Sequence, residues 1–83
     1  MDNQRTKVIF RKDKHDGEIV AFFPDSYFYG VLTCYEHLGQ HGTATIEYYW
    51  TTERATAEEY KDLYNELTNI IGYDLKIMQR MTY

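Results

Sequence analysis

The sequence has little of several residue types whose abundance would point to a particular class of protein. A single cysteine, Cys34, cannot form an intramolecular disulfide, which indicates a reducing compartment and predicts a cytoplasmic protein. One proline and five glycines argue against a linker or a low-complexity tract. No apolar run approaches the roughly 20 residues of a transmembrane helix, and the first residues include no apolar stretch. We therefore expect neither a membrane partner nor a signal peptide.

The composition is that of one folded domain. Hydrophobic residues make up 43% of the chain and charged residues 27%, which is typical of a globular protein rather than a disordered one. With 83 residues the chain is too short for two independent cores, so residues 1–83 should form a single domain, with residues 1–5 disordered. Aromatic residues are abundant at 17%, and nine of them are tyrosines.

Charge is unevenly distributed along the chain. Residues 1–14 carry five basic and two acidic side chains, a net charge of +3, whereas the remainder carries four basic and eleven acidic side chains, a net charge of −7. An acidic protein rarely attracts nucleic acid through its whole surface, so nucleic acid is not the expected partner. The basic segment is interpreted as a solvated edge strand protected by positive side chains, which are Arg5, Lys7, Arg11, Lys12 and Lys14.

The first two periodic segments predict a β-hairpin. Residues 6–14 and 18–24 flank Asp16-Gly17, and an Asp-Gly pair between alternating segments is the strongest short-range hairpin signal. A two-residue turn at this pair places Phe10 opposite Phe23. The proline at the end of the second segment cannot donate to a ladder, so the strand should end there and be followed by a connection.

Residues 31–38 and 43–52 predict a second hairpin around a turn at residues 39–42. A helix over residues 26–38 is the alternative, because apolar side chains there also recur at helical spacing. Pairing the two strands across the turn gathers the more apolar side chains on one face. The expected core face consists of Val31, Thr33, Tyr35, Ala44, Ile46, Tyr48 and Trp50.

Residues 57–71 predict an amphipathic helix. Thr56 and Glu59 fit a capping box at its start, and Gly72 fits the left-handed residue that follows a helix end. One side of the helix is apolar and should pack on the sheet, whereas the opposite side carries four carboxylates. The apolar side consists of Tyr60, Leu63, Tyr64, Leu67, Ile70 and Ile71, and the acidic side of Glu58, Glu59, Asp62 and Glu66.

Residues 73–83 alternate apolar and polar side chains and predict a final strand. The order β-β-β-β-α-β implies an α+β fold, in which a twisted, mainly antiparallel sheet carries one amphipathic helix on one face. Five strands span roughly 20–24 Å and one helix is about 10 Å wide, so the second face should be exposed. It is expected to bind a partner protein or a second copy, as a homodimer. This possible binding surface consists of Ile9, Arg11, Val20, Phe22, Leu32 and Tyr49.

Candidate catalytic and metal-binding residues are few. Cys34, His37 and His41 are the nearest approach to a zinc site, but zinc usually takes four ligands and these three lack a second pair. Cys34 could act as a nucleophile beside a histidine, yet no basic cluster or helix start lies near it in sequence to lower its pKa. We therefore assign no catalytic residue, no metal ligand and no cofactor, and expect a protein that is not an enzyme.

Four segments carry a resemblance to known sequences. They resemble small uncharacterised proteins encoded on bacterial mobile elements and phages, over residues 6–80. The resemblance implies an accessory or counter-defence role and supplies no site residue. The segments are Val8-Ile9-Phe10-Arg11-Lys12, residues 18–24, residues 34–42 and Tyr48-Tyr49.

Together these features predict a small non-enzymatic accessory protein that binds another protein or a second copy of itself. The alternative is a nucleic-acid-binding protein, or a nucleic-acid mimic whose acidic helix side imitates the charge of DNA. A small hydrolase that uses Cys34 is the third hypothesis.

Overall fold

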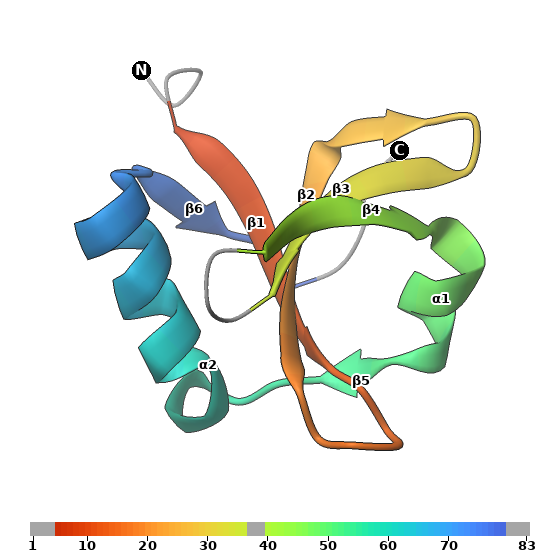
Figure 1. Cartoon of the computed structure of the whole chain (residues 1–83), viewed down its shortest axis with the longest axis horizontal. Coiled ribbons are helices and arrows are strands. Elements are labelled where there is room, and N and C mark those ends of the chain that lie inside the picture. Colours follow the sequence, from red (N-terminus) through yellow and green to blue (C-terminus); the bar gives the residue numbers. More distant parts are fainter. Residues whose placement is uncertain (1–4, 37–39, 80–83) are drawn as a thin grey trace.

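The computed structural model describes residues 5–36 and 40–79. Of residues 1–5, which are expected to be disordered, residues 1–4 lie outside this part of the chain, whereas Arg5 lies within it and donates to the Leu75 carbonyl. Figure 1 shows a curved sheet with one helix on each side. The elements are β1 (Thr6–Lys12), β2 (Ile19–Phe28), β3 (Val31–Glu36), β4 (Gln40–Thr45), α1 (Ile46–Thr51), β5 (Glu53–Arg54), α2 (Ala57–Asn65), the π-helix η2 (Glu66–Ile71) and β6 (Leu75–Ile77).

The sheet has six strands in the described residues, in the order β4-β3-β2-β1-β5, with β6 also paired to β1. The pairing of β6 with β1 is parallel and all other pairings are antiparallel. The predicted α+β class with a mainly antiparallel sheet is confirmed. The expectation that the basic segment is an edge strand is wrong, because β1 has strands along both of its edges.

The β1–β2 turn is longer than predicted. Phe10 lies opposite Ala21 rather than Phe23, because Asp13 instead of His15 pairs with Glu18 and the turn therefore has four residues rather than two. The Asp13 carboxylate accepts the backbone N–H groups of His15 and Asp16 at 2.7 and 3.4 Å, which stabilises the wider turn. The register differs from the prediction by two residues, so every side chain keeps its predicted face.

The prediction that β2 ends at Pro24 is wrong, since β2 continues to Phe28. The proline nevertheless interrupts the β2–β3 ladder, which has no regular pairs between Phe23 and Phe28. The hydroxyl of Ser26 bridges the two strands where the ladder is interrupted. It donates to the Phe23 carbonyl at 2.6 Å and accepts the backbone N–H of Thr33 at 2.7 Å. Residues 31–36 form a strand, so the alternative of a helix over residues 26–38 is wrong for these residues.

The predicted strand over residues 43–52 is wrong after Thr45. The Thr45 hydroxyl accepts the Tyr48 backbone N–H at 3.1 Å and caps α1, which turns back across the sheet. The predicted core face is also wrong. The register differs from the prediction, since Val31 pairs with Thr45. In addition β3 is buried on both faces, at Leu32 on one and at Tyr35 on the other. Among its other expected members, Trp50 is exposed on α1.

The predicted helix is confirmed at both ends. The capping box of Thr56 and Glu59 is formed, and Gly72 has a φ of +96°. Its last turns are a π-helix, whose wider turn places Ile71 43% exposed rather than in the core. The side chain of Ile70 lies outside the described part.

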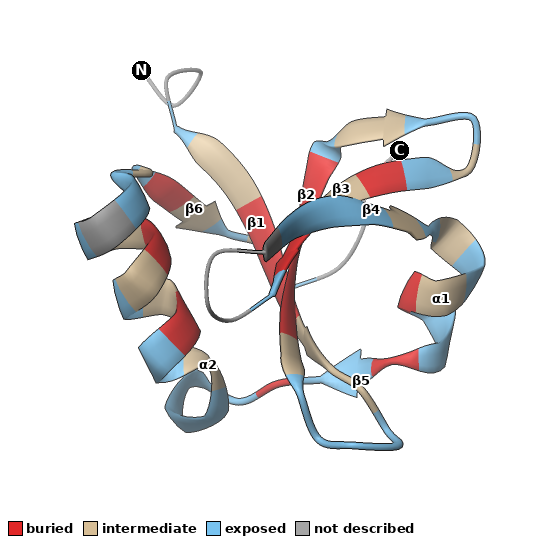
Figure 2. Cartoon of the chain, viewed as in Figure 1, coloured by how far each residue is buried: buried red, intermediate tan, exposed pale blue. Residues whose placement is uncertain are grey.

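Both faces of the sheet are buried within the chain (Figure 2). On one face α2 and η2 cover a cluster of Val8, Phe10, Ala21, Phe23, Tyr35, Ala55, Leu63, Leu67 and Leu75. On the other face Tyr49 of α1 covers a cluster that also contains Ile9, Val20, Phe22, Leu32 and Cys34. The predicted exposed binding surface is therefore wrong, because all five of its apolar residues are at most 1% exposed. Its sixth member, Arg11, lies 5.0 Å over the Tyr49 ring.

Leu67 and Ile71 predict different costs of truncation. Leu67 is fully buried, so Leu67→Ala should lower the free energy of unfolding by about 2–5 kcal/mol. Ile71→Ala should cost less than about 1 kcal/mol, because that residue is already 43% exposed. Urea unfolding of both variants measures the difference, and equal losses would show that the packing of α2 and η2 on the sheet is misassigned.

Candidate functional site

The β2–β3 hairpin ends in two exposed aromatic side chains, and it projects at the upper right of Figure 1. Phe28 is 69% exposed and Tyr29 88% exposed, and their rings contact each other edge to face at 4.3 Å. Beside them Val31 is 40% exposed. We call residues 28–31 the hairpin tip.

The tip is built by a two-residue turn. Tyr29 and Gly30 have φ values of +49° and +81°, which are the signs that a type I′ turn requires at both central positions. Tyr29 is the one non-glycine residue with a positive φ in the described part of the chain, and this conformation costs a bulky residue about 1–2 kcal/mol. The Gly30 carbonyl accepts the backbone N–H of Ile46 at 2.8 Å, so the turn is joined to the start of α1.

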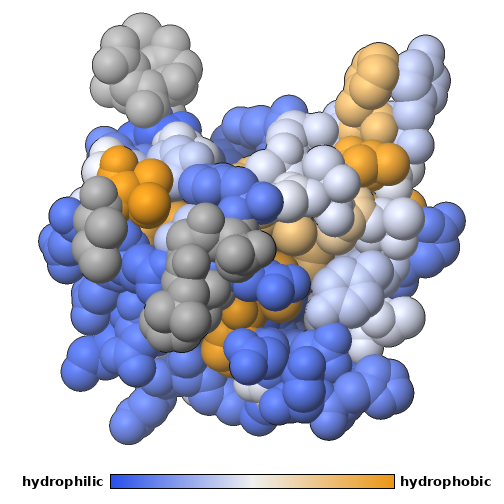
Figure 3. Space-filling view, viewed as in Figure 1, coloured by the Kyte–Doolittle hydropathy of each residue, from blue (hydrophilic) through white to orange (hydrophobic). Residues whose placement is uncertain are grey.

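The residues of the tip and of the groove beside it carry no charged side chain. The groove is shallow, with a volume of about 160 Å³, and is lined by Ser26, Phe28, Val31, Leu32, Thr33 and Thr43. Figure 3 shows apolar side chains gathered on the hairpin, whereas the lower part of the same view is hydrophilic. No lysine or arginine occurs in residues 25–36 or 40–50. The tip therefore offers an aromatic contact without a positive field.

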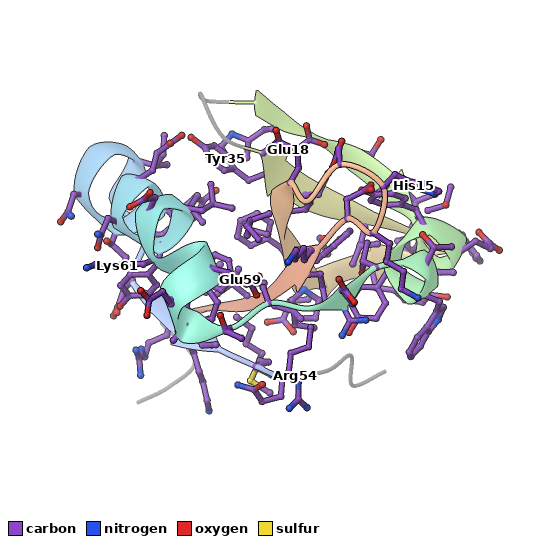
Figure 4. The ribbon with its side chains drawn as sticks, turned by 90° about the horizontal axis from the view of Figure 1, so that it is seen from below. His15, Glu18, Tyr35, Arg54, Glu59 and Lys61 are labelled. Carbon is purple, nitrogen blue, oxygen red and sulfur yellow. The ribbon has the colours of Figure 1, made fainter. Side chains whose placement is uncertain are left out.

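A second hollow, of about 240 Å³, lies between the β1–β2 turn and α2. Figure 4 shows Glu18 and Glu59 on its two sides. Glu59 is already bonded to Lys12 at 2.6 Å, and this bond lowers the pKa of Glu59 and raises the pKa of Lys12. In residues 5–36 and 40–79 no three His, Cys, Asp or Glu side chains are grouped so that they could hold a metal ion. The hollow is therefore a solvated acidic surface with one carboxylate held in an ion pair.

Cys34 and His41, which the sequence analysis weighed as zinc ligands or a thiol site without assigning them, do not converge. Cys34 belongs to the cluster under α1, whereas the His41 ring contacts Tyr35 at 4.6 Å on the α2 face. His37 lies outside the described residues. Burial, followed by the nearby Glu36 carboxylate, raises the pKa of the Cys34 thiol, which disfavours the nucleophilic thiolate.

The opposite end of α2 is tied to β3 and β4 by aromatic side chains. The Tyr35 hydroxyl donates to Glu66 of η2, and Figure 4 shows Tyr35 between the sheet and the helix. His41 Nε2 lies 3.2 Å from the Tyr73 hydroxyl. These contacts join the sheet to η2 and to the segment that follows it, so they have a structural role.

The positive charge of the N-terminal segment is compensated locally. Of its five basic side chains, three form ion pairs with carboxylates, and Arg11 donates to the Thr52 hydroxyl at 3.0 Å and the Thr52 carbonyl at 2.6 Å. The ion pairs are Arg5–Asp74, Lys7–Asp25 and Lys12–Glu59. Four of the five basic side chains are therefore engaged within the chain, which makes them less available to phosphate groups.

Tyr48 and Asp13 form a contact that the sequence analysis missed. The Tyr48 hydroxyl donates to Asp13 at 2.6 Å, so α1 is joined to the β1–β2 turn. Burial, followed by this bond, raises the pKa of Tyr48, and the same bond lowers the pKa of Asp13. A tyrosine 35 residues from an aspartate gives no local signal of such a pair.

In comparisons with protein-family models, curated proteins and solved structures, no family model, curated protein or solved structure matches this chain. Among the described residues, no helix is both long enough and apolar enough to cross a membrane. The candidate site is accordingly argued from its geometry, which favours the hairpin tip over the acidic hollow and the Cys34 environment.

Asp13 predicts a loss of stability in acid. A carboxyl group whose pKa is lowered on folding stabilises the fold above its ordinary pKa of 3.8, and this contribution is lost as the pH falls through the lower, folded value. Asp13→Asn should therefore destabilise the protein at neutral pH, and its difference from wild type should shrink at about pH 3. Urea unfolding of wild type and Asp13→Asn at neutral pH and at about pH 3 measures this difference in the free energy of unfolding. The same difference at both would contradict a role for the charge.

The adjacent tyrosines of α1 predict opposite responses to loss of the hydroxyl. The Tyr49 hydroxyl is buried with no hydrogen-bond partner among the described residues, so Tyr49→Phe should leave the free energy of unfolding unchanged or raise it by about 1 kcal/mol. Tyr48→Phe should lower it, because the bond to Asp13 is lost. Thermal and urea unfolding show which variant is the less stable. A greater loss of stability for Tyr49→Phe than for Tyr48→Phe would contradict the prediction.

Proposed function

We propose that this chain is a small non-enzymatic protein that acts by contact with another protein through the hairpin tip. The observation that carries the proposal is Tyr29, which is 88% exposed in a conformation that is costly for its side chain. Strained positions that the packing does not require are found preferentially at functional sites. Exposed tyrosine and phenylalanine also supply large contact area to protein interfaces at a low entropy cost.

The charge around the tip favours a protein partner over nucleic acid. Proteins that stack bases on aromatic side chains also follow the phosphates with basic groups. No basic side chain belongs to the tip or lines its groove, and Lys7, Arg11 and Lys12 of β1 are engaged within the chain. The nucleic-acid-mimic alternative is weakened because Glu59 and Glu66, two of the four acidic side chains of the helix, are bonded to Lys12 and Tyr35.

The remaining parts of the hypothesis each depend on a single observation. The raised pKa of the buried Cys34 thiol argues against the hydrolase alternative. A cytoplasmic location stays a prediction from the single cysteine. An accessory role on a mobile element stays a prediction from the resemblance.

The test uses a substitution that should improve the turn while removing the contact. Asparagine tolerates a positive φ better than tyrosine, so Tyr29→Asn should keep or raise the unfolding midpoint. Proteins captured from a bacterial lysate by immobilised wild type should be lost on Tyr29→Asn. For a captured protein then purified, we expect the dissociation constant to rise about tenfold or more by fluorescence anisotropy.

Ile71→Asn is the matched control, because Ile71 is an exposed apolar residue on η2 rather than on the tip. This variant should retain every captured protein. Equal capture by wild type and Tyr29→Asn would contradict the proposal. A salt-sensitive complex with single-stranded DNA that is unaffected by Tyr29→Asn would instead favour the nucleic-acid alternative.

A further inference from the structure

The strand β4 forms an edge of the sheet. It pairs with β3 along its whole length, from Gln40 opposite Glu36 to Thr45 opposite Val31. No strand within residues 5–36 and 40–79 pairs with its outer side. A strand in this position presents backbone N–H and C=O groups that a further strand can pair with.

β4 also lacks the features by which edge strands usually avoid pairing. Its sequence, Gln-His-Gly-Thr-Ala-Thr, contains no proline, no lysine and no carboxylate. The strand is coloured as exposed along most of its length in Figure 2, and its described side chains are exposed except for the half-buried Ala44. The edge is therefore accessible and has neither the proline nor the charged side chains that commonly prevent strand pairing.

We propose that the outer edge of β4 pairs antiparallel with β4 of a second copy of this chain. A two-fold axis perpendicular to the sheet keeps the two faces of each copy aligned, so residues of the same face must lie opposite one another. The register that centres the strand places Thr43 opposite Thr43 of the second copy. His41 then lies opposite Thr45, and Gly42 opposite Ala44.

The side chains in this register are self-complementary. Thr43 is directly opposite Thr33 within one copy, so pairing at Thr43 creates a row of four threonines across the two sheets. Threonine pairs across strands are favourable, and no like charges are brought opposite one another. A strand from a different protein would need pockets for its own side chains, whereas a second β4 needs none.

The groove beside the hairpin tip includes Thr43 on this same edge. In the proposed dimer the grooves of the two copies lie on the same face of one continuous sheet. The inference is independent of the proposed function, because β4 pairs through its backbone and the hairpin tip is not part of the paired strand.

Light scattering at high micromolar concentration tests the proposal on the full chain. Wild type should have about twice the 10.0 kDa mass of one chain. Thr43→Lys and Thr43→Glu each place like charges opposite each other at the two-fold axis, and each should raise the dimer dissociation constant about tenfold or more. An equimolar mixture of the two variants should restore the dimer, because the opposed charges are then opposite in sign.

Asn69→Lys is the charge control, because Asn69 is exposed on η2 and should leave the dimer intact. Tyr29→Asn should also stay dimeric, which separates this inference from the role of the hairpin tip. A wild type of 10.0 kDa, or position-43 variants that remain dimeric alone, would overturn the proposal. If the position-43 variants do not fold, amide exchange on wild type decides. Protection of residues 41–45 that grows with protein concentration supports the paired edge, and protection independent of concentration overturns it.

Discussion

The position of β1 in the middle of the sheet is the constraint on which the rest of the structure depends. One edge of β1 pairs with β2, and the other is shared between β6 at its start and β5 at its end. Its apolar side chains alternate between the two clusters, with Val8 and Phe10 under α2 and Ile9 under α1. Because one strand supplies both cores, α1 and α2 are held on opposite faces of the same sheet.

Local signals predicted the elements that are stabilised locally. The capping box at Thr56 and the glycine at position 72 mark the ends of α2 and η2 correctly, since both features act through neighbouring backbone groups. The same kind of argument failed at residues 46–51, where aromatic and β-branched side chains are typical of a strand. There the Thr45 cap and the burial of Tyr49 against the sheet favour a helix, and this burial is a tertiary effect.

The candidate site could be predicted only in part. The proline at position 24 predicts only a connection after it, although Tyr29-Gly30 between Phe28 and Val31 is a pattern typical of a two-residue turn. Four of the five apolar residues expected on an exposed face lie in one cluster as predicted, because alternation along β1, β2 and β3 is a local signal. The fifth, Tyr49, joins the cluster from α1 rather than from the predicted strand. The burial of these residues could not be predicted, because it depends on α1, and the sequence of α1 was assigned to a strand.

The parallel pairing of β6 with β1 has a consequence for the order of folding. Thr6 pairs with Leu75, so this contact joins segments about as far apart in sequence as the described chain allows. During synthesis β1 can pair with β2 early, whereas the β6 residues leave the ribosome after every other described strand. Until then the start of β1 remains an unpaired edge with Val8 uncovered by β6, and closing so long a loop is slow. The nascent chain is therefore most open to wrong strand pairing at the same strand that organises the finished fold.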